Sequence, residues 1–177
     1  MYLITACFDE KTNKSLQRWM DQVASASGNH FMADHKVPPH LTITSFESRA
    51  EREPQLIELT RQLSDRLCTG DIQFVSIGAL LPYVLYATPV LNQYLQVLQN
   101  QVSESFSDLD EVRISRFYQL YQWLPHVTLG KTLDKEQMQL AFGAMQSRFA
   151  PFEGRIVELG LAKVNPHEDL IRIHLKP

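Results

Sequence analysis

Two short segments of the sequence carry the same pattern of reactive side chains. The first, PPHLTITSF (38–46), contains His40 and Thr42, and the second, LPHVTLGKT (124–132), contains His126 and Thr128. Alternate residues of a β-strand point to the same face of its sheet. If both segments are strands, each presents an imidazole beside a hydroxyl on one face, while its apolar residues point the opposite way, into a core.

Two such pairs brought to one place would suit the cleavage of a phosphodiester bond. The reaction needs one group that removes a proton from the nucleophile and another that protonates the leaving oxygen, and two imidazoles near neutral pH can serve as both. The threonine hydroxyls can hydrogen-bond the non-bridging phosphate oxygens as charge develops on them. This chemistry requires no metal and no cofactor.

Hydrophobic periodicity predicts the elements that must position these residues. Strands are expected over 2–8, 40–46, 72–80, 84–88, 126–131, 155–164 and 170–175, and helices over 14–27, 54–67, 91–106 and 135–149. The order helix, His-Thr strand, helix, strand, strand therefore occurs twice. Segment 113–123 is rich in aromatic residues and ambiguous, and NPHED (165–169) has the composition of a turn.

The spacing of matched segments indicates an internal duplication. His40 and His126 are 86 positions apart (126 − 40), as are segments 84–87 and 170–173, whereas the similar segments VSIGAL and VELGLA begin 82 apart (157 − 75). We therefore predict an α+β fold in which two pseudo-symmetric lobes, each an antiparallel sheet with helices on its outer face, flank an active-site groove. The chain is expected to form one domain over 1–177, with repeat units of roughly 11–90 and 91–177 and an added first strand in 1–10.

The HLTI and HVTL segments, set in two halves of a chain of this size, resemble the two-histidine (2H) phosphoesterase superfamily, in particular its bacterial 2′-5′ RNA ligase-like and cyclic phosphodiesterase branch. The resemblance implies that His40 and His126 form the catalytic pair, that Thr42 and Thr128 bind phosphate, and that Lys131 adds a phosphate contact. It also implies metal-independent action on 2′,3′-cyclic phosphates or 2′-5′ linkages of RNA ends or small nucleotides. After its first motif this chain reads TSFES, which departs from the usual run of the branch.

Other residues near the motifs allow more than one interpretation. The segment RISRFYQLYQW (113–123) interleaves cations with aromatic rings just before the second motif. A nucleotide base could stack on Tyr118 while Arg116 contacts a phosphate, or the segment could simply cover the interface between the lobes. His167 is assigned to a turn, and His174 could face either the groove or solvent.

Two other functions compete with the phosphoesterase hypothesis. The groove could bind a nucleotide or an RNA end without catalysis. A metallohydrolase using His30 and His35 with His40 is a third interpretation, but the linker offers neither a matching cysteine nor paired carboxylates, so His30 and His35 are expected to be solvated loop residues.

Composition limits the partners that we expect. The net charge of −3 argues against a broad surface for long nucleic acid, though it allows a small nucleotide or an RNA 3′ end as substrate. The N-terminal segment lacks the basic region that is typical of a signal peptide, and no apolar run is long enough for a membrane span. Cys7 and Cys68 indicate no disulfide framework. We therefore expect a cytoplasmic monomer that does not associate with membranes.

Overall fold

Strands and helices alternate along the chain in the computed structural model, which describes residues 1–119, 121–164 and 166–177. The strands are β1 (Tyr2–Phe8), β2 (Leu41–Glu47), β3 (Gly70–Leu80), β4 (Val84–Pro89), β5 (Arg113–Ile114), β6 (Val127–Gly130), β7 (Phe152–Lys163) and β8 (Glu168–His174). The helices are α1 (Glu10–Ser27), α2 (Phe31–Asp34), α3 (Glu53–Ser64), α4 (Gln93–Ser107) and α5 (Lys135–Gln146), with short 3₁₀ turns η1 (Ala50–Arg52) and η2 (Arg116–Tyr118). Every predicted helix and strand is present, with ends shifted by a few residues.

The ends of α1 show why such shifts occur. Its first residue is Glu10, four positions before the predicted start, because the Asp9 side chain accepts a hydrogen bond of 2.9 Å from the Thr12 backbone N–H. This N-cap satisfies one of the backbone donors that a helix leaves unpaired at its start. The helix ends before Gly28, whose φ of 71° lies in the left-handed region that glycine adopts without strain. Apolar spacing located the buried stripe of the helix, whereas the cap determines its length.

Two predicted segments differ from simple expectations. The ambiguous segment 113–123 contains the two-residue strand β5 and the turn η2, so it is only briefly extended. The NPHED turn is shorter than predicted, because β8 already begins at Glu168. Leu120 and Asn165, which belong to these two segments, lie outside the described residues.

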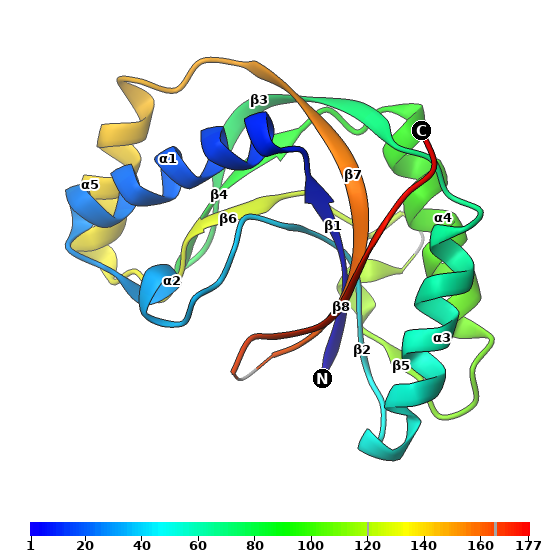
Figure 1. The fold of residues 1–177 in the computed structure, drawn as a ribbon. Coiled ribbons are helices and arrows are strands. Elements are labelled where there is room, and N and C mark those ends of the chain that lie inside the picture. The colour runs from blue at the N-terminus through cyan, green and yellow to red at the C-terminus, as the bar shows by residue number, and fades with distance from the viewer. Residues whose placement is uncertain (120, 165) are drawn as a thin grey trace.

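The strands form one antiparallel sheet in the order β5-β2-β1-β7-β3-β4-β6, and β8 pairs with β7 outside this path (Figure 1). The long strand β7 connects the two halves. Its first residues, 152–156, pair with β3, whereas residues 156–163 pair with β1 and residues 158–163 with β8. The predicted α+β class with antiparallel strands is confirmed, and the two expected sheets are parts of one continuous sheet.

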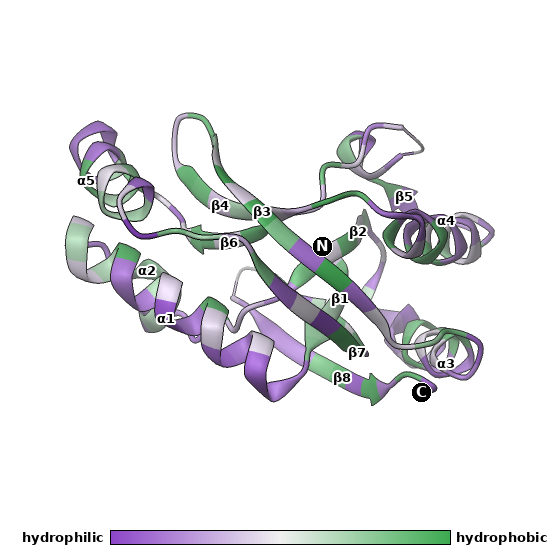
Figure 2. Cartoon of the chain, turned by 90° about the horizontal axis from the view of Figure 1, so that it is seen from above, coloured by the Kyte–Doolittle hydropathy of each residue, from purple (hydrophilic) through white to green (hydrophobic). Residues whose placement is uncertain are grey.

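The helices cover this sheet in two groups on opposite sides of the molecule (Figures 1 and 2). Helices α1 and α5 pack against each other, with α1 also against β6 and α5 against β4. Helices α3 and α4 lie on the other side, where α4 contacts β2 and α3 contacts β7 and β8. Each half of the sheet, together with the helices that cover it, therefore contains elements of both predicted repeat units. The two units are interleaved in the fold.

The core contains one aromatic cluster in each half of the sheet. Phe46 is stacked between Tyr2, at a ring-centroid distance of 5.9 Å, and Phe106, at 5.0 Å. In the other half, Phe74 stacks on Phe152 at 4.8 Å. These rings are buried or nearly so, and burial of such large apolar surfaces dominates the stabilisation of a core.

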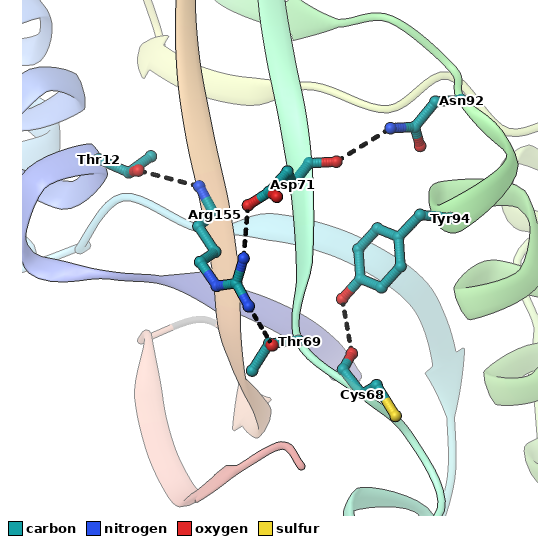
Figure 3. Close-up of polar contacts among 7 residues, drawn as sticks. All are labelled: Thr12, Cys68, Thr69, Asp71, Asn92, Tyr94 and Arg155. Atoms are coloured by element: carbon teal, nitrogen blue, oxygen red, sulfur yellow. Dashed lines mark hydrogen bonds and ion pairs between the residues drawn. The ribbon is translucent and has the colours of Figure 1, made fainter. Parts of the chain in front are cut away.

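A polar network ties β3 and β7 to the helices where the two halves meet (Figure 3). The Arg155 guanidinium of β7 donates hydrogen bonds of 2.7 Å to both Asp71 Oδ1 and Thr69 Oγ1. The Arg155 backbone N–H donates to Thr12 Oγ1 of α1 at 3.1 Å, and Asn92, the N-cap of α4, donates to the Asp71 carbonyl at 3.0 Å. These hydrogen bonds attach the first turns of α1 and α4 to β7 and β3, where the two halves of the sheet meet.

Within residues 1–119, 121–164 and 166–177, none of the helices combines the length and the apolar character that a membrane span needs.

Candidate active site

A cavity of about 570 Å³ brings the two sequence motifs together. Its walls include His40 and Thr42 at the start of β2, and His126 and Thr128 at the start of β6. Between these residues, Leu41 and Val127 are fully buried, and Ile43 and Leu129 are at most 1% exposed. The strand alternation inferred from the sequence therefore holds in both motifs: the apolar residues anchor each strand in the core and leave the histidine and threonine at the cavity.

The two histidines are held by the same local contact. His40 Nδ1 lies 2.9 Å from the Pro38 carbonyl oxygen, and His126 Nδ1 lies 2.9 Å from the Leu124 carbonyl oxygen. A carbonyl oxygen only accepts, so in both rings Nδ1 carries the hydrogen and donates it. Nε2 of each neutral ring is then left with a lone pair that can accept a proton.

The proline before each histidine explains why this contact occurs twice. A proline ring fixes φ near −65° and restricts the preceding residue to extended conformations. In both motifs this proline stands between the histidine and the carbonyl that accepts its hydrogen bond. The Pro-His sequence therefore reduces the conformational freedom of the imidazole before any substrate binds.

Burial favours the neutral form of both imidazoles. It is the main reason why the pKa of His40 falls to about 4, a shift that the hydrogen bond to Pro38 partly opposes and the charge of His167 increases. Burial also lowers the pKa of His126, again partly opposed by its bond to the Leu124 carbonyl. A phosphate anion in the cavity would act in the opposite direction, because a nearby negative charge stabilises an imidazolium.

The other predicted site residues occupy different positions. Lys131 lines the cavity, with its Nζ 5.7 Å from the centroid of the Phe31 ring. Tyr118 also lines it; burial raises the pKa of its phenol, and the hydroxyl of Thr42 opposes that shift. Arg116 is not among the described residues of the wall, and its guanidinium lies 4.8 Å from the centroid of Phe117.

The segment around Tyr118 also has a structural role. Gln99 of α4 donates a hydrogen bond of 2.9 Å to the Tyr118 carbonyl. Trp123 Nε1 donates to the Thr42 carbonyl at 3.0 Å, so this indole is held against β2. Both interpretations of segment 113–123 therefore apply in part: Tyr118 faces the cavity, while Trp123 covers the strand that carries the first motif.

No group of three or more His, Cys, Asp or Glu side chains within the described part of the chain is arranged to hold a metal ion.

A comparison with models of protein families shows which family the chain belongs to. The family model described as the 2′-5′ RNA ligase superfamily matches residues 12–168, which cover most of the chain and both motifs. The protein belongs to the 2′-5′ RNA ligase superfamily. This result confirms the resemblance to 2H phosphoesterases noted from the HLTI and HVTL segments.

Solved structures share the superfamily fold. TT0787 of Thermus thermophilus aligns with a TM-score of 0.64 at 16% identity, over 99% of this chain and 97% of that one. LigT of E. coli in complex with 3′-AMP aligns with a TM-score of 0.57 at 15% identity, over 99% and 98% of the two chains. A search of curated proteins finds no significant match. At these identities the structural likeness establishes the fold alone.

Other residues of the cavity wall were not predicted to belong to the phosphoesterase site, among them Phe31, His35 and His167. The linker before the first motif contains α2, and the ring of His35, which follows this helix, stacks on the ring of Phe31 at 4.0 Å between centroids. His35 is exposed, as expected for a loop residue, but it faces the cavity as well. The spacing of four residues between Phe31 and His35 is compatible with one helical face, whereas no local signal marked His167.

Proposed function

We propose that this protein is a metal-independent phosphoesterase that cleaves 2′,3′-cyclic phosphates or 2′-5′ phosphodiester bonds in small nucleotides or at RNA 3′ ends. The observation that carries the proposal is the pair of imidazoles in one cavity, each oriented by the same Nδ1 hydrogen bond and each two residues from a threonine. Such a pair can remove one proton and deliver another without a metal ion.

For a cyclic phosphate, the reaction would use each of these groups once. One imidazole accepts a proton from water through Nε2 as the water oxygen forms a bond to phosphorus. The bond between phosphorus and one ribose oxygen breaks, and the other imidazole, initially protonated, donates its Nε2 proton to that oxygen. Thr42 and Thr128 donate hydrogen bonds to the non-bridging oxygens, whose negative charge increases in the transition state. The two histidines end with their protonation states exchanged, and solvent restores them.

The size and lining of the cavity support a nucleotide as the substrate. A cavity of about 570 Å³ is larger than a phosphate group alone would fill. Part of its wall is apolar and is formed by Phe31, Met32 and Val37. Pockets of this size and character accommodate small organic ligands. A structure of the related fold, E. coli LigT, contains 3′-AMP. We infer that a nucleoside lies against this apolar wall while its phosphate meets the two motifs.

Lys131 and Arg116, the two cations of the predicted site, are proposed to contact different substrates. Lys131 lies in the cavity wall and is proposed to contact the phosphate of any bound nucleotide. Arg116 is proposed to contact only substrates that extend past the cavity, together with Tyr118 at its edge. We expect the protein to act as a monomer on such substrates.

The decisive test replaces each histidine with alanine. His40→Ala and His126→Ala should each reduce the turnover of a nucleoside 2′,3′-cyclic phosphate by at least about 10³-fold in EDTA-containing buffer, while circular dichroism shows an intact fold. His174→Ala is the matched control, because its side chain is 82% exposed and does not line the cavity.

Full activity in either cavity variant would contradict the proposal. Nucleotide binding without turnover of cyclic or 2′-5′ substrates would instead identify a non-catalytic binding module. Loss of activity in EDTA, restored by added divalent metal, would contradict the metal-independent mechanism.

A further inference from the structure

A third histidine lies beside the predicted catalytic pair. His167 belongs to the turn between β7 and β8, and its ring stacks on the ring of His40 at 5.6 Å between centroids and 22° between planes. Its side chain is only 9% exposed and lines the same cavity. Its buried Nε2 has no hydrogen-bond partner among the described residues. Unpaired buried polar atoms are uncommon, and they call for an explanation.

A carboxylate and a guanidinium stand behind this imidazole. Asp169 Oδ1 lies 3.3 Å from His167 Nε2, within ion-pair distance but without hydrogen-bond geometry. The other carboxylate oxygen, Oδ2, accepts a hydrogen bond of 2.5 Å from Arg172 Nη2. Contact with His167 is the largest influence that lowers the pKa of Asp169, and Arg172 lowers it further against the effect of burial. Asp169 is therefore a fixed anion beside His167.

This arrangement makes the two otherwise similar motifs unequal. The ring nearest to His126 is that of Tyr86, at 5.2 Å and tilted by 57°, and a phenol carries no charge near neutral pH. His40 instead faces an ionisable ring. Two imidazolium rings 5.6 Å apart repel each other, so a positive charge on His167, beside the Asp169 carboxylate, favours the neutral form of His40.

Other charged and titratable groups surround His40 on several elements. They are Asp169 and Arg172 of β8, His167 of the preceding turn, His126 of the second motif, Tyr118 of η2, Lys131 after β6, and His35 after α2. Burial is the largest influence on the pKa of His40; among the charges, His167 and Arg172 lower it and Asp169 raises it. The charge of His167 therefore lowers the pKa of His40 further, in addition to the lowering caused by burial.

We propose that His167 is a positioning residue that keeps His40 neutral, so that His40 accepts the proton of the attacking water and His126 donates the proton to the leaving oxygen. The inference rests on the proposed phosphoesterase function and assigns the two proton-transfer roles within it. In the cyclic phosphate reaction, the water proton moves to His40 Nε2 as the new P–O bond forms. The proton of His126 Nε2 moves to the ribose oxygen as the old P–O bond breaks.

The test combines a titration with a rate profile. His167→Gln retains a polar side chain of similar size but cannot carry the charge. NMR of ¹³C/¹⁵N-labelled histidines should show the His40 titration midpoint rising by about one to two pH units, with that of His126 unchanged. The ascending limb of kcat/KM against pH for a 2′,3′-cyclic nucleotide should move upward with the His40 midpoint. His174→Gln, at the end of β8 but exposed and outside the cavity wall, should leave both measurements unchanged.

Each other outcome has a defined meaning. An unchanged His40 midpoint in His167→Gln, a shift of His126 instead, or a uniform loss of rate at every pH would overturn the proposal. If this variant does not fold, the wild-type titration decides, because the proposal requires the His40 midpoint to lie below that of His126. Absence of turnover in the wild type would overturn the proposed function and its proton roles, while the His40 midpoint would still establish separately whether His167 controls that ring.

Discussion

Replacement of His40 should make the protein less sensitive to acid, although the residue belongs to the proposed active site. The pKa of His40 is about 4 in the folded protein, below its ordinary value of 6.5, mainly because of burial. Between these two pH values the unfolded chain binds a proton that the folded protein does not. The contribution of His40 to stability is therefore fully present above about pH 6.5 and is lost as the pH falls toward 4.

The size of the effect follows from this difference. Each pKa unit corresponds to about 1.4 kcal/mol, so the complete shift is worth roughly 3.4 kcal/mol, of which about 2.5 kcal/mol is lost by pH 4.5. His40 is only half-buried and lines the cavity, and screening by water reduces the value to about 2 kcal/mol. In His40→Gln, which has no titrating group at this position, the loss of unfolding free energy between pH 7.5 and pH 4.5 should be smaller by about this amount.

Urea titrations in phosphate-free and sulfate-free buffer would measure the effect. The quantity of interest is the difference in unfolding free energy between the two pH values for each protein, so any loss of packing common to both pH values cancels. His174→Gln, at an exposed position, should behave as the wild type does. An equal pH dependence in His40→Gln and the wild type would refute the conclusion that His40 is held neutral by the folded structure.

The remaining predictions concern catalysis. Thr42→Val and Thr128→Val remove the proposed phosphate hydrogen bonds while keeping side-chain volume, and each should lower kcat/KM for a cyclic nucleotide by about 10²-fold with unchanged thermal stability; activity within about twofold of wild type would exclude that role. Because burial lowers the pKa of both histidines, kcat/KM should be bell-shaped with its maximum below about pH 6.5: protonation of the base reduces it near pH 4, and deprotonation of the acid reduces it at higher pH. A steady-state pH series would check this, and a maximum clearly above about pH 6.5 would contradict it.

Local sequence patterns were sufficient for most of the secondary structure. The alternation in HLTI and HVTL placed Leu41 and Val127 in the core and the threonines at the cavity, because successive side chains of a strand point to opposite faces. Helix ends were less accurate, as at Asp9, because a cap depends on one side-chain hydrogen bond and not on periodicity.

The two Pro-His motifs and their repeated spacing can be read from the sequence, and they led to the α+β fold class, the superfamily and the paired histidines and threonines of the predicted site. The tertiary structure was needed to show that β7 joins both halves in one sheet and that His167 lies against His40. These two histidines are 127 positions apart in the chain (167 − 40), and they meet because β1 pairs with both β2 and β7 while β8 returns along β7. Periodicity within one strand shows which face a side chain occupies, whereas the order and register of strands determine which side chains meet on that face.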